Sequence, residues 1–450
     1  MISREHNLTE GPIYRRIAAF ALPILLSNLL QQMYNSVDSL ILGRFAGESA
    51  LAASGSVGAL LNLLIGFSLG LATGVTVLHA LRFGEGDQPG MRRLVDNALI
   101  LAVLAAAAVT ALGAAFADGL LALMHIPGEV LGDARKYLLI VLAGALSTLL
   151  YNVGAGVVRG EGDSLFPLLC LALGGAVNLV LDYILVALAG LGIGGAAWAT
   201  VAAQTLTAVM ILFRLTRLDA RHALRPGRIA FHRATARELI RVSLPCGLQS
   251  STFGISNFII QTRINTFGAV VMAGCTAYTK IDAFVYMPCI ALSAAASTFV
   301  GQNMGAGRTE RLRSGIRACI GIAMGTTALL AGTILLLIRP LMGLFSPVPQ
   351  VIEAGAEMAR CLLPFVWFYP ISDVLGGAVR GGGQSLPPTL ISILCICLLR
   401  VVWLWVFPAS LGTRIVYYCY PVSWWLSCFG ILWYYFRRSE VRRRVIGAGA

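Results

Sequence analysis

The stretches AGVVRGEGDSLFP (residues 155–167) and GGAVRGGGQSLPP (residues 376–388) are two versions of one sequence, and they decide the fold. Arg159 lies 221 residues before Arg380. Other pairs keep this spacing to within one residue, namely Ser164/Ser385, Pro167/Pro388, Gly84-Glu85-Gly86 with Gly305-Ala306-Gly307, and Leu22-Pro23 with Leu244-Pro245. A constant offset at several sites indicates an internal duplication into halves of about 220 residues.

The composition places this duplicated chain in a membrane. Of its 450 residues, 57% are hydrophobic and 12% are charged, whereas a soluble domain has about 25% charged residues. A membrane-spanning helix needs about 20 mostly apolar residues. Twelve such runs lie near 17–42, 51–79, 94–116, 136–158, 165–187, 194–214, 239–267, 271–300, 314–338, 356–379, 386–408 and 413–436. We therefore predict an all-α polytopic membrane protein with 12 transmembrane helices in two six-helix bundles.

The basic residues orient these spans. If both termini are cytoplasmic, 25 of the 34 Lys and Arg residues fall in cytoplasmic segments and six in external ones. This bias follows the positive-inside rule, so we read the net charge of +13 as topology and expect no nucleic-acid partner. Six spans per half give both halves one orientation, which predicts a pseudo-twofold axis along the membrane normal. We expect the chain in the cytoplasmic membrane.

The predicted organisation is a lobe over 1–214, a basic cytoplasmic linker over 215–238 and a second lobe over 239–450. The linker carries six arginines among apolar residues. It can be a solvated connection or a helix lying on anionic headgroups. The chain has no G-x-x-x-x-G-K-[ST] phosphate loop, and its ten cysteines show no metal-site spacing. We expect no ATP hydrolysis, no cofactor and no catalytic residue.

Ionisable residues within spans are functional candidates because charge in hydrocarbon costs several kcal/mol. In the first half, Asp38 and Asp182 lie about 6–7 Å below the outer ends of their helices at 1.5 Å per residue. Three polar residues share that level or lie one turn away, namely Tyr34, Asn178 and Thr200. We predict a pocket in which two carboxylates resist being ionised together, so that one takes up a proton and acts as a switch.

The second half lacks this pair, since Ile260 and Trp403 occupy the equivalent positions. Its own polar candidates are Lys280, Asp282 and Asp373. We expect Lys280 to need a carboxylate partner, for which Asp373 is a candidate, and we interpret Arg263 and Arg400 as structural or interfacial. Pro23 and Pro245 interrupt the backbone hydrogen bonds of their helices. Pro23 is either a static bend or a hinge that responds to Asp38.

Seven segments give the chain a resemblance to the multidrug and toxic compound extrusion (MATE) family, which covers nearly the whole sequence. They are LPILLSNLLQQMYNSVDSLILGRFAG (22–47), VVRGEGDS (157–164), NLVLD (178–182), LPCGLQS (244–250), INTFG (264–268), KIDAFVYMP (280–288) and VGQNMGAGRTERLR (300–313). The resemblance is closest to the DinF-like branch. It implies a monomeric exporter of organic, often cationic, amphiphiles in exchange for H⁺ or Na⁺.

The resemblance also assigns residues. In the DinF-like branch the first-helix Asp and the fifth-helix N-x-x-x-D belong to the cation site, which here means Asp38, Asn178 and Asp182. Tyr34 and Thr200 fall where that branch has pocket residues. On helix 7 the chain has Gln261 and Arg263 in place of the acidic residues of the sodium-coupled NorM-like branch. We therefore expect proton coupling, with Na⁺ at Asp38, Asn178 and Asp182 as the alternative.

Other functions remain as alternatives. A lipid-linked oligosaccharide flippase of the wider superfamily needs a large basic cavity, whereas the predicted first-half pocket is acidic. A membrane-embedded enzyme needs a metal-ligand pattern or a Ser/His pair within the spans, and neither is present. A gated channel is disfavoured because the halves show no fourfold pore-loop repeat.

Overall fold

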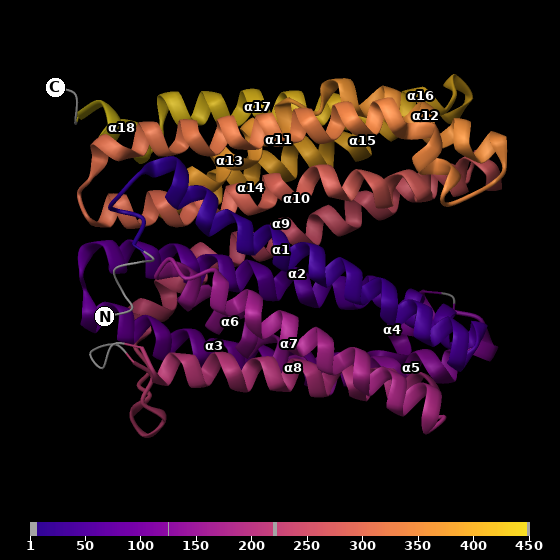
Figure 1. The fold of residues 1–450 in the computed structure, drawn as a ribbon, viewed down its shortest axis with the longest axis horizontal. Coiled ribbons are helices and arrows are strands. Elements are labelled where there is room, and N and C mark those ends of the chain that lie inside the picture. Colours follow the sequence, from indigo (N-terminus) through magenta and orange to yellow (C-terminus); the bar gives the residue numbers. More distant parts are fainter. Residues whose placement is uncertain (1–6, 125, 219–222, 448–450) are drawn as a thin grey trace. The chain divides into compact units, whose positions relative to one another are not determined.

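The computed structural model describes residues 7–124, 126–218 and 223–447, and within these ranges every regular element is a helix (Figure 1). The prediction of an all-α polytopic membrane protein is confirmed. The first half forms α1 (Ile13–Ile41), α2 (Glu48–Glu85), α3 (Gln88–Ala115), α4 (Ala117–Leu123), α5 (Gly128–Ala143), α6 (Ala145–Gly160), α7 (Leu165–Asp182) and α8 (Gly192–Thr216). The π-helical segments η2 (Leu42–Ala46) and η3 (Tyr183–Leu188) extend α1 and α7.

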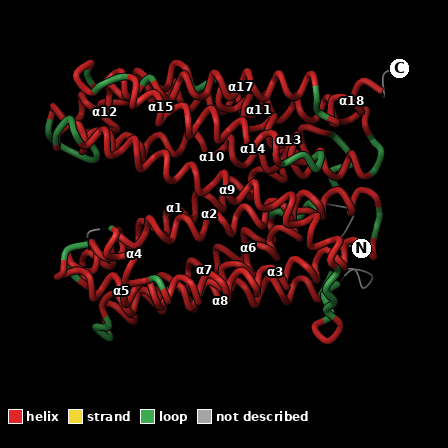
Figure 2. The backbone as a smooth tube through the Cα atoms, turned by 180° about the vertical axis from the view of Figure 1, so that it is seen from behind, coloured by secondary structure: helices red, strands yellow, loops and turns green. Residues whose placement is uncertain are grey.

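The second half repeats this order with more interruptions. It forms α9 (Arg233–Asn265), α10 (Ala269–Gly305), α11 (Thr309–Gly343), α12 (Pro349–Leu362), α13 (Phe368–Gly381), α14 (Leu386–Ser392), α15 (Leu399–Val406), α16 (Thr413–Tyr417), α17 (Cys419–Arg437) and α18 (Glu440–Gly447). A π-helical segment, η6 (Ile393–Leu398), joins α14 to α15. The tube in Figure 2 shows that helices make up most of the described chain.

Each of the twelve predicted spans is occupied by helix. Nine helices in the described part of the chain are long and apolar enough to cross a membrane, and two bent pairs raise this number to 11. The bent pairs are α5 with α6, at 45°, and the helix ending at Phe365 with α13, at 56°. The remaining predicted span, 239–267, is α9, whose polar residues (Gln249, Ser250, Gln261 and Arg263 among them) lower its hydropathy.

The chain folds into two compact units, which are residues 26–247 and the described parts of 1–25 with 248–450. The division falls inside α1 and α9, two residues after Pro23 and after Pro245. The start of α1 therefore belongs with the second half of the chain, and the start of α9 with the first. The predicted lobes, in contrast, place these two helices whole within their own halves.

The same packing recurs inside each unit. In the unit 26–247, α2 packs against α3, α5 and α6. In the other unit, α10 packs against α11, α12 and α13, which are the equivalent helices (Figure 1). Each unit is held by buried apolar side chains, around Leu94, Leu149 and Ile211 in one and around Tyr278, Met342 and Trp424 in the other.

Turn geometry repeats at the offset of 221 residues. Gly47 and Gly268 have φ of 91° and 94°, and Gly162 and Gly383 have φ of 96° and 80°. Only glycine adopts such values without strain. Gly162 and Gly383 lie in the repeated stretch of the two halves, where they turn the chain just after α6 and α13. The duplication is therefore visible in the backbone as well as in the sequence.

Helix contacts explain the rest of that stretch. A Cβ on Gly156 would lie 2.7 Å from the Ala72 carbonyl oxygen of α2, and one on Gly160 would lie 2.8 Å from His79 Cβ. In the other unit a Cβ on Gly377 or Gly381 would lie 2.3 Å from a carbonyl oxygen of α10. Glycines four residues apart thus let α6 and α13 pack backbone to backbone on the central helix of each unit.

Both ends of the predicted linker, 215–238, belong to the neighbouring helices α8 and α9. Residues 219–222 lie outside the described residues. The described remainder consists of the end of α8, the 3₁₀ turn Pro226–Arg228 and the first turns of α9, which begins six residues earlier than predicted. Residues 223–232 form no helix that could lie along headgroups. The Leu224 amide instead donates to the Leu215 carbonyl at 3.0 Å.

Candidate functional site

Two helices of the unit 26–247 bring the predicted first-half residues together. On α1, Tyr34 and Asp38 lie one turn apart, and on α7, Asn178 and Asp182 do the same. Asn178 and Asp182 are 2% and 1% exposed, while Asp38 is half-buried. Asp182 is the last residue of α7, and the π-helical η3 follows it directly. Such π segments occur frequently at functional sites.

The carboxyl groups of Asp38 and Asp182 interact with each other. Four of the buried polar atoms here have no hydrogen-bond partner among the described residues, namely Asp38 Oδ1, Asn178 Nδ2 and both Asp182 oxygens. Buried polar groups are normally hydrogen-bonded. Two ionised carboxylates offer no donor to each other, so a proton or a small cation is what satisfies this arrangement.

Two cavities lie beside this arrangement, and Asp38 lines one of them. A cavity of about 270 Å³ is lined by Tyr34, Asp38, Asn178 and apolar residues of α1 and α7. A second cavity, of about 120 Å³, lies among α1, α2, α6, α7 and α8. Tyr34 and Asn178 line both cavities. The polar residues of the second cavity are Gln31, Tyr34, Asn35, Thr148, Tyr151, Asn152, Asn178, Thr200, Gln204 and Thr207.

Thr200 thus lines the second cavity but not the one that holds Asp38. Its hydroxyl donates to the Ala196 carbonyl at 3.0 Å within α8. A residue missing from the sequence-based set is Tyr137 of α5, which is 8% exposed and interacts electrostatically with Asp38, Tyr34 and Asp182. The sequence could have revealed Tyr137, because it lies at the outer end of the fourth predicted span, at about the same level as Asp38 and Asp182.

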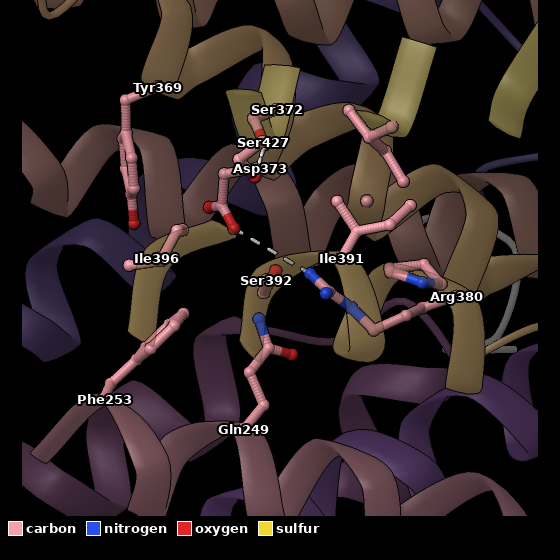
Figure 3. A pocket seen from close by; sticks show the side chains of 13 residues that line it. Gln249, Phe253, Tyr369, Ser372, Asp373, Arg380, Ile391, Ser392, Ile396 and Ser427 are labelled. Carbon is pink, nitrogen blue, oxygen red and sulfur yellow. Dashed lines mark hydrogen bonds and ion pairs between the residues drawn. The ribbon is translucent and has the colours of Figure 1, made fainter. Parts of the chain in front are cut away.

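In the other unit, Asp373 meets Arg380, as Figure 3 shows. Their closest atoms, Asp373 Oδ1 and an Arg380 terminal nitrogen, are 3.9 Å apart. Ser293 links the two residues, because its hydroxyl donates to the Asp373 carbonyl at 2.8 Å and accepts from Arg380 at 3.1 Å. Gln249 points into the same small pocket.

The expected pairing of Asp373 with Lys280 is therefore wrong. Lys280 is exposed and forms no ion pair within the described chain. Its neighbour Asp282 is 7% exposed and accepts a hydrogen bond from the Tyr278 hydroxyl at 3.0 Å. In the first half, Asn152 and Arg159 occupy the positions of Asp373 and Arg380, and Arg159 Nε has no partner among the described residues. The ion pair thus belongs to the second half alone.

Groups of three or more His, Cys, Asp or Glu residues that could hold a metal ion are not found in the described ranges. The first-half arrangement offers two carboxylates and one amide, with hydroxyls nearby. Oxygen groups of this kind suit a proton or a hard monovalent cation better than a transition metal.

Comparison with known proteins gives consistent matches over almost the full length. A family model named MatE matches residues 23–184 and 245–406, one segment in each half, and these segments begin at Pro23 and Pro245. The chain is 26% identical over 443 residues to the probable multidrug resistance protein YpnP of Bacillus subtilis, which covers 98% of this chain and 99% of YpnP. It is 26% identical over 396 residues to the probable multidrug resistance protein NorM of Thermotoga maritima, which covers 86% and 84% of the two chains.

A solved structure shares the fold. The crystal structure of MATE in the bent conformation superposes with a TM-score of 0.91 and covers 100% of both chains at 24% identity. The two segments matched by the family model contain every candidate described above except Thr200. Asp38 and Asp182 lie in the first segment, and Asp282 and Asp373 lie in the second.

Proposed function

We propose that this chain, which belongs to the MATE family of multidrug efflux transporters, is a secondary antiporter that exports organic amphiphiles, often cationic, in exchange for protons. One observation supports this most directly. Asp38 and Asp182 interact, and three of their four carboxylate oxygens are buried without a hydrogen-bond partner among the described residues. Such a pair holds one proton more readily than two negative charges.

The two cavities suggest how a proton could displace a substrate. Tyr34 and Asn178 form part of the wall of both cavities, so the carboxylate pair lies next to the space lined by Gln31, Asn35 and Gln204. Negative charge at the pair attracts a cation in that space through a medium of low dielectric constant. Protonation removes this attraction, and alternating access then requires that the two conformations bind the substrate with different affinity.

The test is dye transport in proteoliposomes. A fluorescent organic cation is followed under a pH gradient alone and under a Na⁺ gradient alone, for the wild type and for Asp38→Asn. We expect transport driven by pH alone, reduced at least tenfold in Asp38→Asn because the variant cannot take up the coupling proton. Asp118→Asn is the matched control, since Asp118 is an exposed carboxylate paired with Arg135 in the same unit.

The other outcomes are equally informative. Full transport by Asp38→Asn would overturn the role of the carboxylate pair. Transport driven only by Na⁺ would replace the proton with Na⁺ at Asp38, Asn178 and Asp182. Absence of dye transport under both gradients would favour a lipid-linked oligosaccharide as the substrate.

We further propose a monomer in the cytoplasmic membrane with both termini in the cytoplasm. The positive-inside bias of the loops supports this orientation. Residues 1–6 and 448–450 lie outside the described residues, and the proposal for the termini rests on the charge of the loops. Pro23 remains proposed as the hinge of α1.

A further inference from the structure

A cationic side chain lies buried in the second unit without an acidic partner. Arg400 of α15 is 5% exposed. It lies six residues before the end of the span Leu386–Val406, which is about 9 Å of helix. No ion pair joins it to a carboxylate in the described part of the chain. A charge at this depth costs several kcal/mol, so an unpaired one points to a function.

The contacts of Arg400 leave part of its guanidinium free. Nε donates to the Ser423 hydroxyl at 2.8 Å, and the guanidinium carbon lies 4.3 Å from the centre of the Tyr420 ring. The two terminal nitrogens have no acceptor among the described residues. Ser423 and Tyr420 therefore fix the orientation of the group, and its fork of terminal N–H donors stays available. That fork matches the two oxygens of a carboxylate.

Arg400 lines a cavity of about 570 Å³ within this unit. Six of the residues that line the cavity are aromatic, namely Phe253, Phe258, Tyr286, Tyr369, Tyr420 and Trp424. Its polar lining residues are Ser256, Asn257, Gln261, Thr279, Asp282 and Arg400. Tyr286 packs edge-on against Tyr369 with ring centroids 4.9 Å apart, so two aromatic side chains of this wall support each other. Aromatic walls with a few fixed polar groups are typical of sites for small organic ligands.

The charge of the cavity restricts the ligand further. Asp282 also lines it, and the Tyr278 hydroxyl already donates to its carboxylate. A ligand with two negative charges would be repelled by Asp282, whereas a single carboxylate can bind Arg400. The aromatic wall then accommodates the rest of the molecule.

We propose that this cavity is a binding site for aromatic monocarboxylates, with the carboxylate held by Arg400. The site is separate from the carboxylate pair of the first half. It binds an anion, whereas that pair attracts a cation. This inference goes beyond the proposed antiport of cations and does not depend on the coupling ion, because binding at equilibrium needs no gradient.

The test is calorimetric titration of the purified full-length protein with 2-naphthoate and with its neutral analogue 2-naphthamide. We expect the wild type to bind the carboxylate at least about tenfold more tightly than the amide, as a charge-assisted pair provides. Arg400→Gln should bring the two affinities to within about twofold. Arg263→Gln is the matched control, because Arg263 donates to the Leu404 carbonyl in the same unit but does not line the cavity.

Asp282→Asn should change naphthoate binding in the opposite direction to Arg400→Gln. Removing the carboxylate should strengthen naphthoate binding several-fold and leave naphthamide binding unchanged, which a merely structural role for either residue would not produce. If Arg400→Gln does not fold, thermal stabilisation of the wild type by naphthoate but not by naphthamide still tests the site. Equal binding of the two ligands by the wild type, or an undiminished preference in Arg400→Gln, would overturn the proposal. Either result leaves the dye-transport experiment with Asp38→Asn unaffected.

Discussion

Single atoms decide where side chains are tolerated in this fold. The clearest case is the adjacent pair Gly376 and Gly377 of α13. A Cβ on Gly377 would lie 2.3 Å from the Ser293 carbonyl oxygen, which is shorter than any real contact of this kind. A Cβ on Gly376 would meet its nearest neighbour, a terminal nitrogen of Arg380, at an ordinary 3.6 Å. Two neighbouring glycines therefore have different reasons to be glycine.

We predict that Gly377→Ala lowers stability by about 1–3 kcal/mol, because the added methyl forces α13 away from α10. Gly376→Ala should be neutral or stabilising by up to about 1 kcal/mol, since alanine favours the helix. Thermal unfolding of the two variants in detergent measures the difference. Equal melting temperatures would show that backbone contact between α13 and α10 is not what requires Gly377.

The sequence predicted which residues of the first-half site lie together, but not the pairing of charged residues in the second half. Depth along each helix placed Tyr34, Asp38, Asn178 and Asp182 at one level, and the structure brings these four together. The pairing of Lys280 with Asp373 is wrong because it depends on the rotation of α10 about its axis. Spacing along one helix does not specify the partner that its face meets on another helix.

At the scale of elements, similar contacts fix the segments that precede α1 and α9. Before α1, the Leu8 amide donates to Gln302 Oε1 at 3.0 Å, and Asn303 Nδ2 donates to the Leu8 carbonyl at 3.3 Å. Before α9, the His232 amide donates to Asn97 Oδ1 at 3.1 Å. The segment before α1 is thus held by α10, which belongs to the same unit as the start of α1. The segment before α9 is held by α3, which belongs to the same unit as the start of α9.

We predict that Gln302→Ala loosens the segment before α1. The Leu8 amide loses its acceptor, so hydrogen exchange over residues 7–12 should accelerate about fivefold, which corresponds to one hydrogen bond of about 1 kcal/mol. Gln384→Ala is the control, because the hydrogen bond that Gln384 accepts comes from the Glu440 amide of the same unit and not from residues 7–12. Unchanged exchange over residues 7–12 would show that the remaining contacts, such as Arg308 with the Thr9 carbonyl, suffice.

Most elements were predictable because long apolar runs leave few alternatives in a membrane. The bends were not. The break at Gly144 divides one predicted span, and the 3₁₀ segment Leu363–Phe365 divides another. Both runs are continuous in hydropathy, so only packing on neighbouring helices reveals the break. The short helices α4 and α18 were also missed, since they lie beyond the apolar runs.

At the scale of the whole molecule, the two units share a framework but not a chemistry. Gly47, Gly162 and their partners 221 residues later keep the same turns. The buried acidic pair is confined to the unit 26–247, whereas Arg400 and the Asp373–Arg380 pair belong to the other unit. Duplicated scaffolds with different buried charges are consistent with different roles in one transport cycle.

The orientation of the whole chain can be tested with cysteines placed on either side of the apolar run of α11. Glu310, in the first turn of α11, and Gln350, in the first turn of α12, are exposed and flank the apolar run of α11. We predict that a membrane-impermeant maleimide labels Gln350→Cys in intact cells and labels Glu310→Cys only after permeabilisation. The native cysteines should contribute little, because all ten are buried except Cys395, which is partly buried. Labelling in the reverse order would invert the proposed topology.

The start of α1 packs with the second half of the chain, and the start of α9 packs with the first half. This arrangement has a consequence for biosynthesis. Residues 7–25 are synthesised before residues 26–247, but the unit to which they belong resumes only at Leu248, more than two hundred residues later. Ile17 and Phe20 are 0% and 3% exposed in the finished protein, and the unit that contains them is incomplete until residues 248–450 are made. A chain that stops at mid-length therefore keeps an uncovered apolar segment at its beginning. Quality control could recognise an incomplete transporter by its first helix.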